Sequence, residues 1–186
     1  MESTRFLTGQ FLLAMPGIGD MRFERAVIAL CAHDENGAVG IGLGAVVEGL
    51  GFHDLLNQLE IEHGDSPNAP IHFGGPVEPR RGFVVHSREW AGQDTIDVAG
   101  RWALSGTIDV LRAIAEGKGP KHWAIALGYA GWESGQLETE LTRPGWLNVR
   151  GATDLIYARS AEERWASGLA MAGVDPRLLV SGAGTA

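Results

Sequence analysis

AVIALCAHDENGAVGIGLGAVV, residues 26–47, contains the clearest indication of the fold class. Two short apolar runs, 26–32 and 38–47, flank the dipeptide Asn36-Gly37. Both residues of that dipeptide tolerate the positive φ of a tight hairpin turn, so the two runs are predicted to pair as antiparallel strands. Such a connection is too short to hold the crossover helix between parallel strands, which argues against a doubly wound parallel sheet.

The rest of the chain contains more predicted strands than helices. Short apolar runs bounded by Gly, Pro or Asp predict strands at 10–15, 82–87, 95–104, 123–130 and 155–158. Apolar residues at helical spacing predict helices at 53–60, 107–116, 134–141 and 160–172, the last opened by a capping box of Ser160 and Glu163. The expected fold class is therefore α+β, a single domain over residues 1–186 with a mixed, largely antiparallel sheet flanked by a few helices.

Length, charge and cysteine content restrict the classes of function. A chain of 186 residues can bury its own core without a disulfide or a metal. Its formal net charge of -8 opposes attraction to a phosphate backbone and argues against direct nucleic-acid binding. The lone Cys31 cannot form an internal disulfide, and no apolar run approaches the ~20 residues of a membrane span. With no signal peptide recognisable at residues 1–5, we expect a cytoplasmic location and no membrane partner.

The glycine content raises the question of a nucleotide site. Glycine accounts for 27 residues, about twice the usual ~7%. Residues 40–45, GIGLGA, match a dinucleotide-binding fingerprint in their letters. That fingerprint needs a strand before it and a helix after it, whereas here a hairpin precedes it and Gly49 and Gly51 interrupt the next residues, so we interpret it as a glycine-rich strand. The six histidines lack the local spacing of a metal site, and neither a metal nor a cofactor is predicted.

Cys31 and His33 are the candidates for a reactive pair. Residues two apart on a strand project from the same face, where a thiol and an imidazole could act together as a nucleophile and its base. The alternative is that Cys31 is a small buried hydrophobe among apolar neighbours.

Aromatic and acidic side chains are densest in residues 127–141. A predicted strand ends there in a glycine turn that carries two aromatic residues, and a helix with polar and acidic residues comes next. These side chains are Tyr129, Trp132, Gln136, Glu138 and Glu140. If the aromatic residues are exposed, the stretch is a ligand or partner surface; if they are buried, it is a corner of the core.

Arg80 and Arg81, with His86 on the next predicted strand, form the clearest cationic group. Two interpretations of the arginines stay open. They bind an anion or an acidic peptide, or they protect the edge of a sheet from pairing with another chain.

Taken in order, these segments resemble the AlgH/YqgE family over nearly the full chain. The most specific motifs are G-G-P-V at 74–77 and G-Y-A-G-W-x-x-G-Q-L-E-x-E at 128–140. Further matching positions are Gly9, Leu13, Ala14, Met15, Pro16, Phe23, Val27, Ile28, Cys31, His33, Gly37, Ala38, Gly40, Phe73, Arg81, Gly82, Phe83, His86, Asp109, Val110, Leu111, Trp146, Leu147, Arg164, Trp165, Gly173, Val174 and Asp175.

The resemblance implies a curved sheet and a small cytoplasmic protein without an established enzymatic activity. It also implies a link, described for some members, to transcriptional control of exopolysaccharide synthesis. The chain departs from the family pattern at Gly44-Ala45, where relatives usually have Asn followed by a basic residue. A function that relies on that Asn or that cation is not expected here, and the local surface is less basic.

The leading hypothesis is a non-enzymatic binding or regulatory module, such as an indirect transcriptional regulator, whose partner is a protein or a small anionic ligand. Its expected surface joins the two family motifs and the cationic group. The residues are Gly74, Gly75, Pro76, Arg81, His86, Tyr129, Trp132, Gln136, Glu138 and Glu140. The alternative is an enzyme with a pocket between the sheet and a helix that uses Cys31, His33 or His86.

Overall fold

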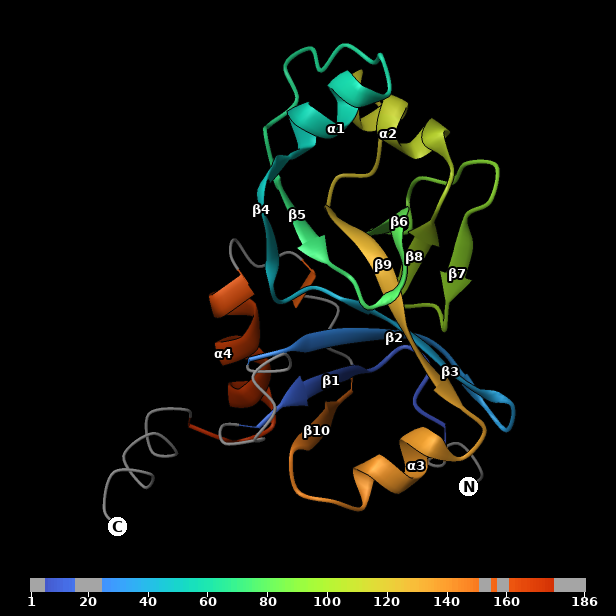
Figure 1. Cartoon of the computed structure of the whole chain (residues 1–186), viewed down its shortest axis with the longest axis vertical. Coiled ribbons are helices and arrows are strands. Elements are labelled where there is room, and N and C mark those ends of the chain that lie inside the picture. The colour runs from blue at the N-terminus through green and yellow to red at the C-terminus, as the bar shows by residue number, and fades with distance from the viewer. Residues whose placement is uncertain (1–5, 16–24, 151–154, 157–160, 176–186) are drawn as a thin grey trace.

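Ten strands of the described chain form one curled sheet (Figure 1). The structure is a computed structural model, and it describes residues 6–15, 25–150, 155–156 and 161–175. The strands are β1 Phe11–Ala14, β2 Val27–Asp34, β3 Gly37–Gly42, β4 Val46–Gly51, β5 Pro70–Phe73, β6 Val77–His86, β7 Ile96–Val98, β8 Trp102–Ser105, β9 Trp123–Glu133 and β10 Trp146–Val149. Their order is β10-β1-β2-β3-β9-β6-β8-β7, with β5 also against β9 and β4 paired to β5. Every pairing is antiparallel except β5 with β9, which confirms the predicted α+β fold with a curved, mixed, largely antiparallel sheet.

The longest strand, β9, joins the two halves of the sheet by changing its partner along one edge. Residues 125–127 pair in parallel with β5, and residues 130–133 pair antiparallel with β3. Where the partner changes, the Gly74 amide donates to the Leu127 carbonyl at 2.8 Å and the Gly42 amide donates to the Gly74 carbonyl at 2.8 Å. The turn after β5 therefore fills the fork between β5 and β3.

Glycines at this fork leave no room for side chains. A Cβ on Gly74 would lie 2.1 Å from the Gly128 carbonyl oxygen, and a Cβ on Gly75 would lie 2.1 Å from the Tyr129 carbonyl carbon. Gly75 and Gly128 also have positive φ angles of 155° and 77°, which residues with a side chain rarely adopt. The turn of the G-G-P-V motif therefore crosses the strand of the G-Y-A-G-W motif with the two backbones in close contact.

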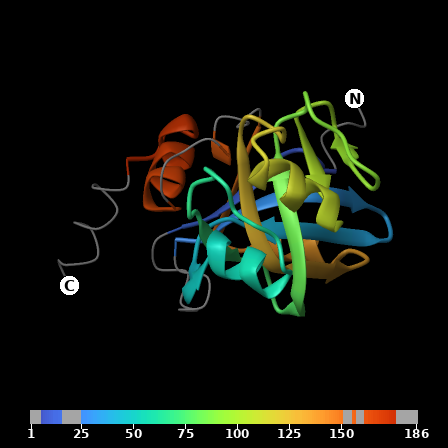
Figure 2. The ribbon, with the colours of Figure 1, turned by 90° about the horizontal axis from the view of Figure 1, so that it is seen from above.

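Hydrophobic side chains pack in three clusters on the two faces of the sheet. The largest cluster lies inside the curl and contains Trp102 and Phe11, which are fully buried. The helices α1 Phe52–Gln58 and α2 Ile108–Ala115 pack with β5, β6 and β9 in the second cluster, and α3 Gln136–Leu141 packs with β1 to β3 in the third. The last helix, α4 Ala161–Met171, stands at one side of the curled sheet (Figure 2).

Two neighbouring side chains attach α4 to the sheet. The buried Arg164 guanidinium donates to the carbonyls of Leu43 and Leu155, each at 2.6 Å, and the Trp165 indole donates to the Ala14 carbonyl at 2.8 Å. Burial lowers the pKa of Arg164 to about 10, which leaves it charged at neutral pH. The carbonyl oxygens therefore compensate for the lost hydration of a buried cation.

The predicted hairpin of residues 26–47 is confirmed, with two differences. The turn lies at Glu35 and Asn36, one residue earlier than expected, and only Gly37 takes a positive φ, of 138°. The predicted strand 38–47 is also divided, because the chain leaves β3 at Gly42 and begins β4 at Val46.

Other boundaries differ because short turns interrupt the apolar runs. The predicted strand 95–104 is the hairpin of β7 and β8, with positive φ at Ala99 and Gly100, and the strands β5 and β10 were not predicted. Leu155 and Ile156 form a short helical turn rather than a strand. Residues 157–158 and the expected cap Ser160 lie outside the described residues.

A bulge in β2 overturns the expected Cys31 and His33 pair. Leu30 pairs with Gly40 and Ala32 pairs with Val39, so Cys31 is an extra residue in the ladder. Cys31 packs against the cluster inside the curl. His33 instead contacts the α3 side, where its Nδ1 accepts from the Leu7 amide at 3.0 Å and its Nε2 lies 2.9 Å from Glu138. The expectation that the two side chains share a face was wrong, because the bulge shifts the alternation by one residue.

Buried histidines make the fold sensitive to acid. Burial, with a smaller contribution from the Arg164 charge, lowers the pKa of His72 from its ordinary 6.5 to about 4. Between those pH values the unfolded chain binds more protons than the folded one, so stability falls as pH falls from about 6.5 toward 4. The loss attributable to His72 is about 3 kcal/mol. Urea unfolding at pH 7.5 and pH 4.5 measures it, and His72→Gln should reduce the difference; an equal difference in both proteins would contradict the assignment.

The thiol of Cys31 should be unreactive in the native protein. Burial raises the pKa of Cys31 to about 12 from an ordinary 9.0, which lowers the thiolate fraction on the order of a thousandfold. A disulfide reagent that releases a coloured thiol should therefore modify the native protein far more slowly than the protein unfolded in guanidinium chloride. Cys31→Ser supplies the blank. Equal rates in native and unfolded protein would show that the thiol is accessible and ionised.

Candidate functional site

The expected surface is only partly assembled. The Gly74-Gly75-Pro76 turn meets β9 at Tyr129 and Ala130, and together with Phe73 it borders a hollow of about 50 Å³. Pro76 is exposed, whereas Gly74 and Gly75 are buried by the backbone crossing. Tyr129 is half-buried, with its ring edge-on to Phe83 at 5.9 Å between centroids. The two motifs thus meet, but the hollow beside them is small.

The polar residues of the second motif lie at α3 and serve internal contacts. Trp132 donates from its indole to Glu140 at 3.0 Å, and Gln136 accepts from the Glu133 amide at 2.9 Å. Glu138 lies against the buried His33. These contacts attach α3 to β2 and β9, so the side chains hold a helix in place rather than line a cleft.

Arg81 and His86 lie apart from the glycine turn, from α3 and from each other. The exposed Arg81 lies 3.4 Å from Glu78 and stacks over the Phe83 ring at 5.0 Å. His86 is fully buried, with its Nε2 2.8 Å from the Ser105 hydroxyl and its Nδ1 2.8 Å from the Ser87 carbonyl. Burial lowers the pKa of His86, which favours the neutral imidazole. The ten expected residues therefore do not form one site.

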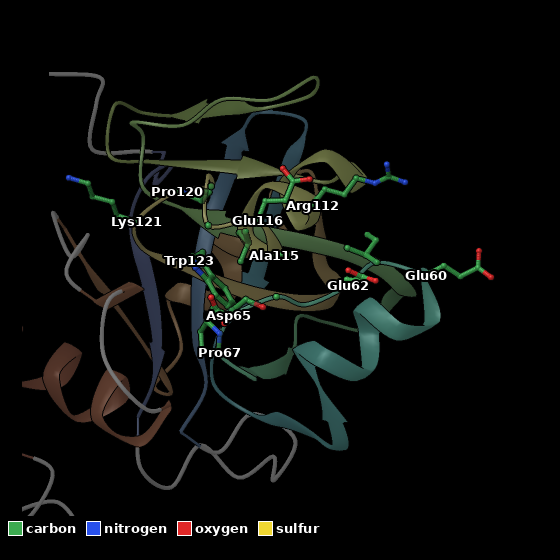
Figure 3. A pocket seen from close by; sticks show the side chains of 16 residues that line it. Glu60, Glu62, Asp65, Pro67, Arg112, Ala115, Glu116, Pro120, Lys121 and Trp123 are labelled. Carbon is green, nitrogen blue, oxygen red and sulfur yellow. The ribbon is translucent and has the colours of Figure 1, made fainter.

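A larger hollow than the one beside the glycine turn lies beyond the ends of α1 and α2 (Figure 3). We call it the loop cleft: a space of about 840 Å³ between residues 60–67 and residues 112–123. Its volume is in the range of small-molecule sites in proteins. The first segment follows α1 and the second begins in the last turn of α2, and the second hydrophobic cluster anchors both helices on the sheet.

Apolar side chains form the floor of the loop cleft. They include Ile61, Ile114, Ala115, Pro120 and Trp123. The Trp123 ring packs on its inner side against Phe52, with centroids 5.2 Å apart, and is half-buried. Its indole N–H has no hydrogen-bond partner among the described residues, so one polar donor is left for a ligand.

The rim of the loop cleft is mainly acidic. Carboxylates come from Glu60, Glu62, Asp65 and Glu116, whereas cations come from Arg112 and Lys121. In Figure 3 the Lys121 side chain extends outward at one end of the cleft, and the Arg112 and Glu60 side chains extend outward at the other. The C-terminal ends of α1 and α2 also point here and add partial negative charge. The cleft should therefore attract positive charge.

A histidine stack supports one wall. The rings of His53 and His63 lie 3.8 Å apart and nearly parallel, at 12°. His53 donates from Nε2 to the Ser66 carbonyl at 2.7 Å, and the Ser66 amide donates to the His63 carbonyl at 3.0 Å. The loop that carries Glu62 and Asp65 is thus tied back to α1.

The sequence analysis did not predict this cleft. Neither residues 60–67 nor residues 112–123 contain a recognised binding motif. The usable signal was the run Gly117 to Pro120 between a helix and a strand that begins with Trp123, together with the acids of residues 60–65.

The described residues offer no group of three or more His, Cys, Asp or Glu side chains arranged to hold a metal ion. Within the same residues, no helix combines the length and the apolar character needed to span a membrane.

Comparison with known proteins identifies the family of this chain. The AlgH-like model, DUF179, matches residues 11–177. A UPF0301 protein of Rhizorhabdus wittichii is 55% identical over 186 residues, which is 100% of both chains, and one of Sphingopyxis alaskensis is 51% identical over 181 residues, 97% of each.

Solved structures agree with the sequence comparison. The solution structure of the AlgH protein from Pseudomonas aeruginosa has a TM-score of 0.76 at 39% identity, over 97% of this chain and 96% of that one. A crystal structure of a Corynebacterium diphtheriae protein, with a TM-score of 0.67 at 20% identity over 87% and 84% of the chains, shows the fold alone. Matched along nearly its whole length in both sequence and fold, the chain belongs to the AlgH-like family.

Proposed function

We propose that this protein is a cytoplasmic, non-enzymatic binding module that holds an organic cation in the loop cleft. The observation that carries the proposal is the combination of an apolar floor with a rim on which carboxylates outnumber cations by four to two. An amine with an apolar body would place its body on the floor and its charge at the rim.

Trp123 gives the floor its selectivity. An indole face attracts a cation through its negative quadrupole, with about 0.5–2 kcal/mol depending on how far water is excluded. The ring is held from behind by Phe52, so it does not need to be ordered when the ligand binds. A preorganised aromatic surface therefore supports both the apolar body and the charge of such a ligand.

The acids of the rim are available to a ligand. Glu62 and Asp65 are exposed and form no hydrogen bond or ion pair with the described residues. The Lys121 side chain extends outward from the cleft (Figure 3), so its charge lies away from the apolar floor. Binding should weaken as salt concentration rises, because the charges lie at the surface.

Regulation would result from a change of protein contacts on ligand binding rather than from direct contact with DNA. A net charge of -8 opposes nucleic-acid binding. The cleft lies at the ends of α1 and α2, so a bound ligand would bridge the segments that come after these two helices.

The proposal is tested by NMR titration with 3-phenylpropylamine, 3-phenylpropan-1-ol and 3-phenylpropionate, which share a ring and differ in charge, with the affinities taken from the amide shifts of the loop cleft. At this cleft the amine should bind most tightly. Glu62→Gln with Asp65→Asn should weaken amine binding roughly tenfold, because each exposed ion pair contributes up to ~1 kcal/mol.

Glu48→Gln is the matched control, since Glu48 is an exposed acid on β4 and does not line the cleft. Amide shifts in NMR spectra should change at residues 61–66 and 114–119. If the alcohol binds as tightly as the amine, or if the double variant binds like the control, the cleft does not select cations.

A second candidate is acyl transfer at Ser105, favoured by one observation. Its hydroxyl lies 2.8 Å from Nε2 of His86, and the Ser87 carbonyl holds Nδ1, as in a nucleophile and base pair. Ser105 is only 1% exposed, however, and its hydroxyl also contacts Thr95 at 2.8 Å. The next amide, of Gly106, already donates to Asp94 at 2.9 Å and so cannot stabilise an oxyanion.

A fluorophosphonate probe separates the two candidates. The native protein should stay unlabelled, because Ser105 is buried and its neighbouring amide is occupied. Mass spectrometry of the treated protein checks this, with Ser105→Ala as the blank. Labelling of Ser105 that the blank lacks would establish a reactive serine and favour the enzyme.

A further inference from the structure

A second pocket lies between α1, α2 and the outer face of the sheet. We call it the helix pocket; its volume is about 200 Å³. Its walls are mostly aliphatic and come from different elements, with Leu55 from α1, Val84 from β6, Val110 and Leu111 from α2, and Ile125 from β9. A cavity of ~150 Å³ with such walls holds a benzene ring, so this one accommodates a phenyl ring or a branched chain.

The rim of the helix pocket exposes apolar surface that the fold leaves uncovered. Leu59 is 37% exposed and Ile108 is 42% exposed, and both line the pocket. The area is far below the several hundred Å² of a stable protein interface, which favours a small occupant over a partner protein.

Arg80 adds a free cation at the same rim. It lines the helix pocket, is exposed, and makes no ion pair or hydrogen bond with the described residues. Its neighbour Arg81 differs, since Glu78 and the Phe83 ring occupy it. A carboxylate at the mouth would therefore find Arg80 unpaired by the residues that the structure describes.

Polar groups inside the helix pocket are already paired. Ser105 contacts His86 and Thr95, and the Thr107 hydroxyl contacts Asp94 and Asp109. The inner part of a ligand should consequently be apolar, because the single O–H of each of these hydroxyls is already engaged and the other walls are mostly aliphatic.

We infer that the helix pocket binds a small amphipathic carboxylate, with its ring or branched chain among the aliphatic walls and its carboxylate on Arg80. The site is separate from the loop cleft and selects the opposite charge. It also assigns a role to Arg80 that differs from the protection of a sheet edge.

The test is an NMR titration with 3-phenylpropionate and its neutral amide, 3-phenylpropanamide. The acid should shift the amides of Val84, Ser105, Val110 and Leu111 in a saturable manner and bind about fivefold tighter than the amide. Arg80→Gln should remove that preference, whereas Arg81→Gln, the adjacent and already paired arginine, should keep it. Leu59→Ser should weaken both ligands equally, because it removes apolar surface and no charge.

Each outcome decides the inference. Equal effects of the two arginine variants, equal binding of acid and amide to the wild type, or shifts scattered outside the helix pocket would overturn it. Saturation of the loop cleft by 3-phenylpropylamine is measured in the same spectra, so failure at one site is distinguishable from failure at the other.

Discussion

The structure depends on the backbone crossing at Gly74, Gly75 and Gly128. Two chain segments approach there so closely that a single methyl group on any of these glycines would overlap a carbonyl group of the other segment. The crossing allows one edge of β9 to pair with β5 and then with β3. It thereby joins the half of the sheet that packs against α1 and α2 to the half that packs against α3. The close backbone contact therefore accounts for the glycines of the two family motifs. The hollow beside these motifs is small.

Local sequence was sufficient for the elements whose signals are local. The hairpin of β2 and β3 formed within one residue of the turn that Asn36-Gly37 predicted, and the helix α2 formed where periodicity predicted it. Local sequence was insufficient where contacts between distant segments determine the backbone conformation. The bulge at Cys31 and the partner change of β9 arise from neighbouring strands, and β5 is a four-residue strand whose place is set by β9. No period within the chain encodes such choices.

The site was less predictable than the fold, for a related reason. Trp132, Glu138 and Glu140 stand out in the sequence as a polar and aromatic cluster, yet their partners are other conspicuous residues, and together they secure α3. The acids of the loop cleft are ordinary in sequence and become a group only because α1 and α2 end beside each other. Arg80 and Arg81 are equivalent in the sequence, and only their contacts in the fold distinguish them, since Arg81 meets Glu78 and the Phe83 ring whereas Arg80 lines the helix pocket.

The helix α2 forms a wall of both hollows, with Ile108 and Leu111 on the helix pocket and Ala115 and Glu116 on the loop cleft. Its dipole favours an anion near the first end and a cation near the last. If a ligand in one hollow displaced this helix, the affinity of the other hollow would change, and by thermodynamic reciprocity the second ligand would act on the first by the same factor. Under the two proposed binding modes, the eight residues of α2 would lie beside both ligands and would couple the two hollows if either ligand displaced the helix.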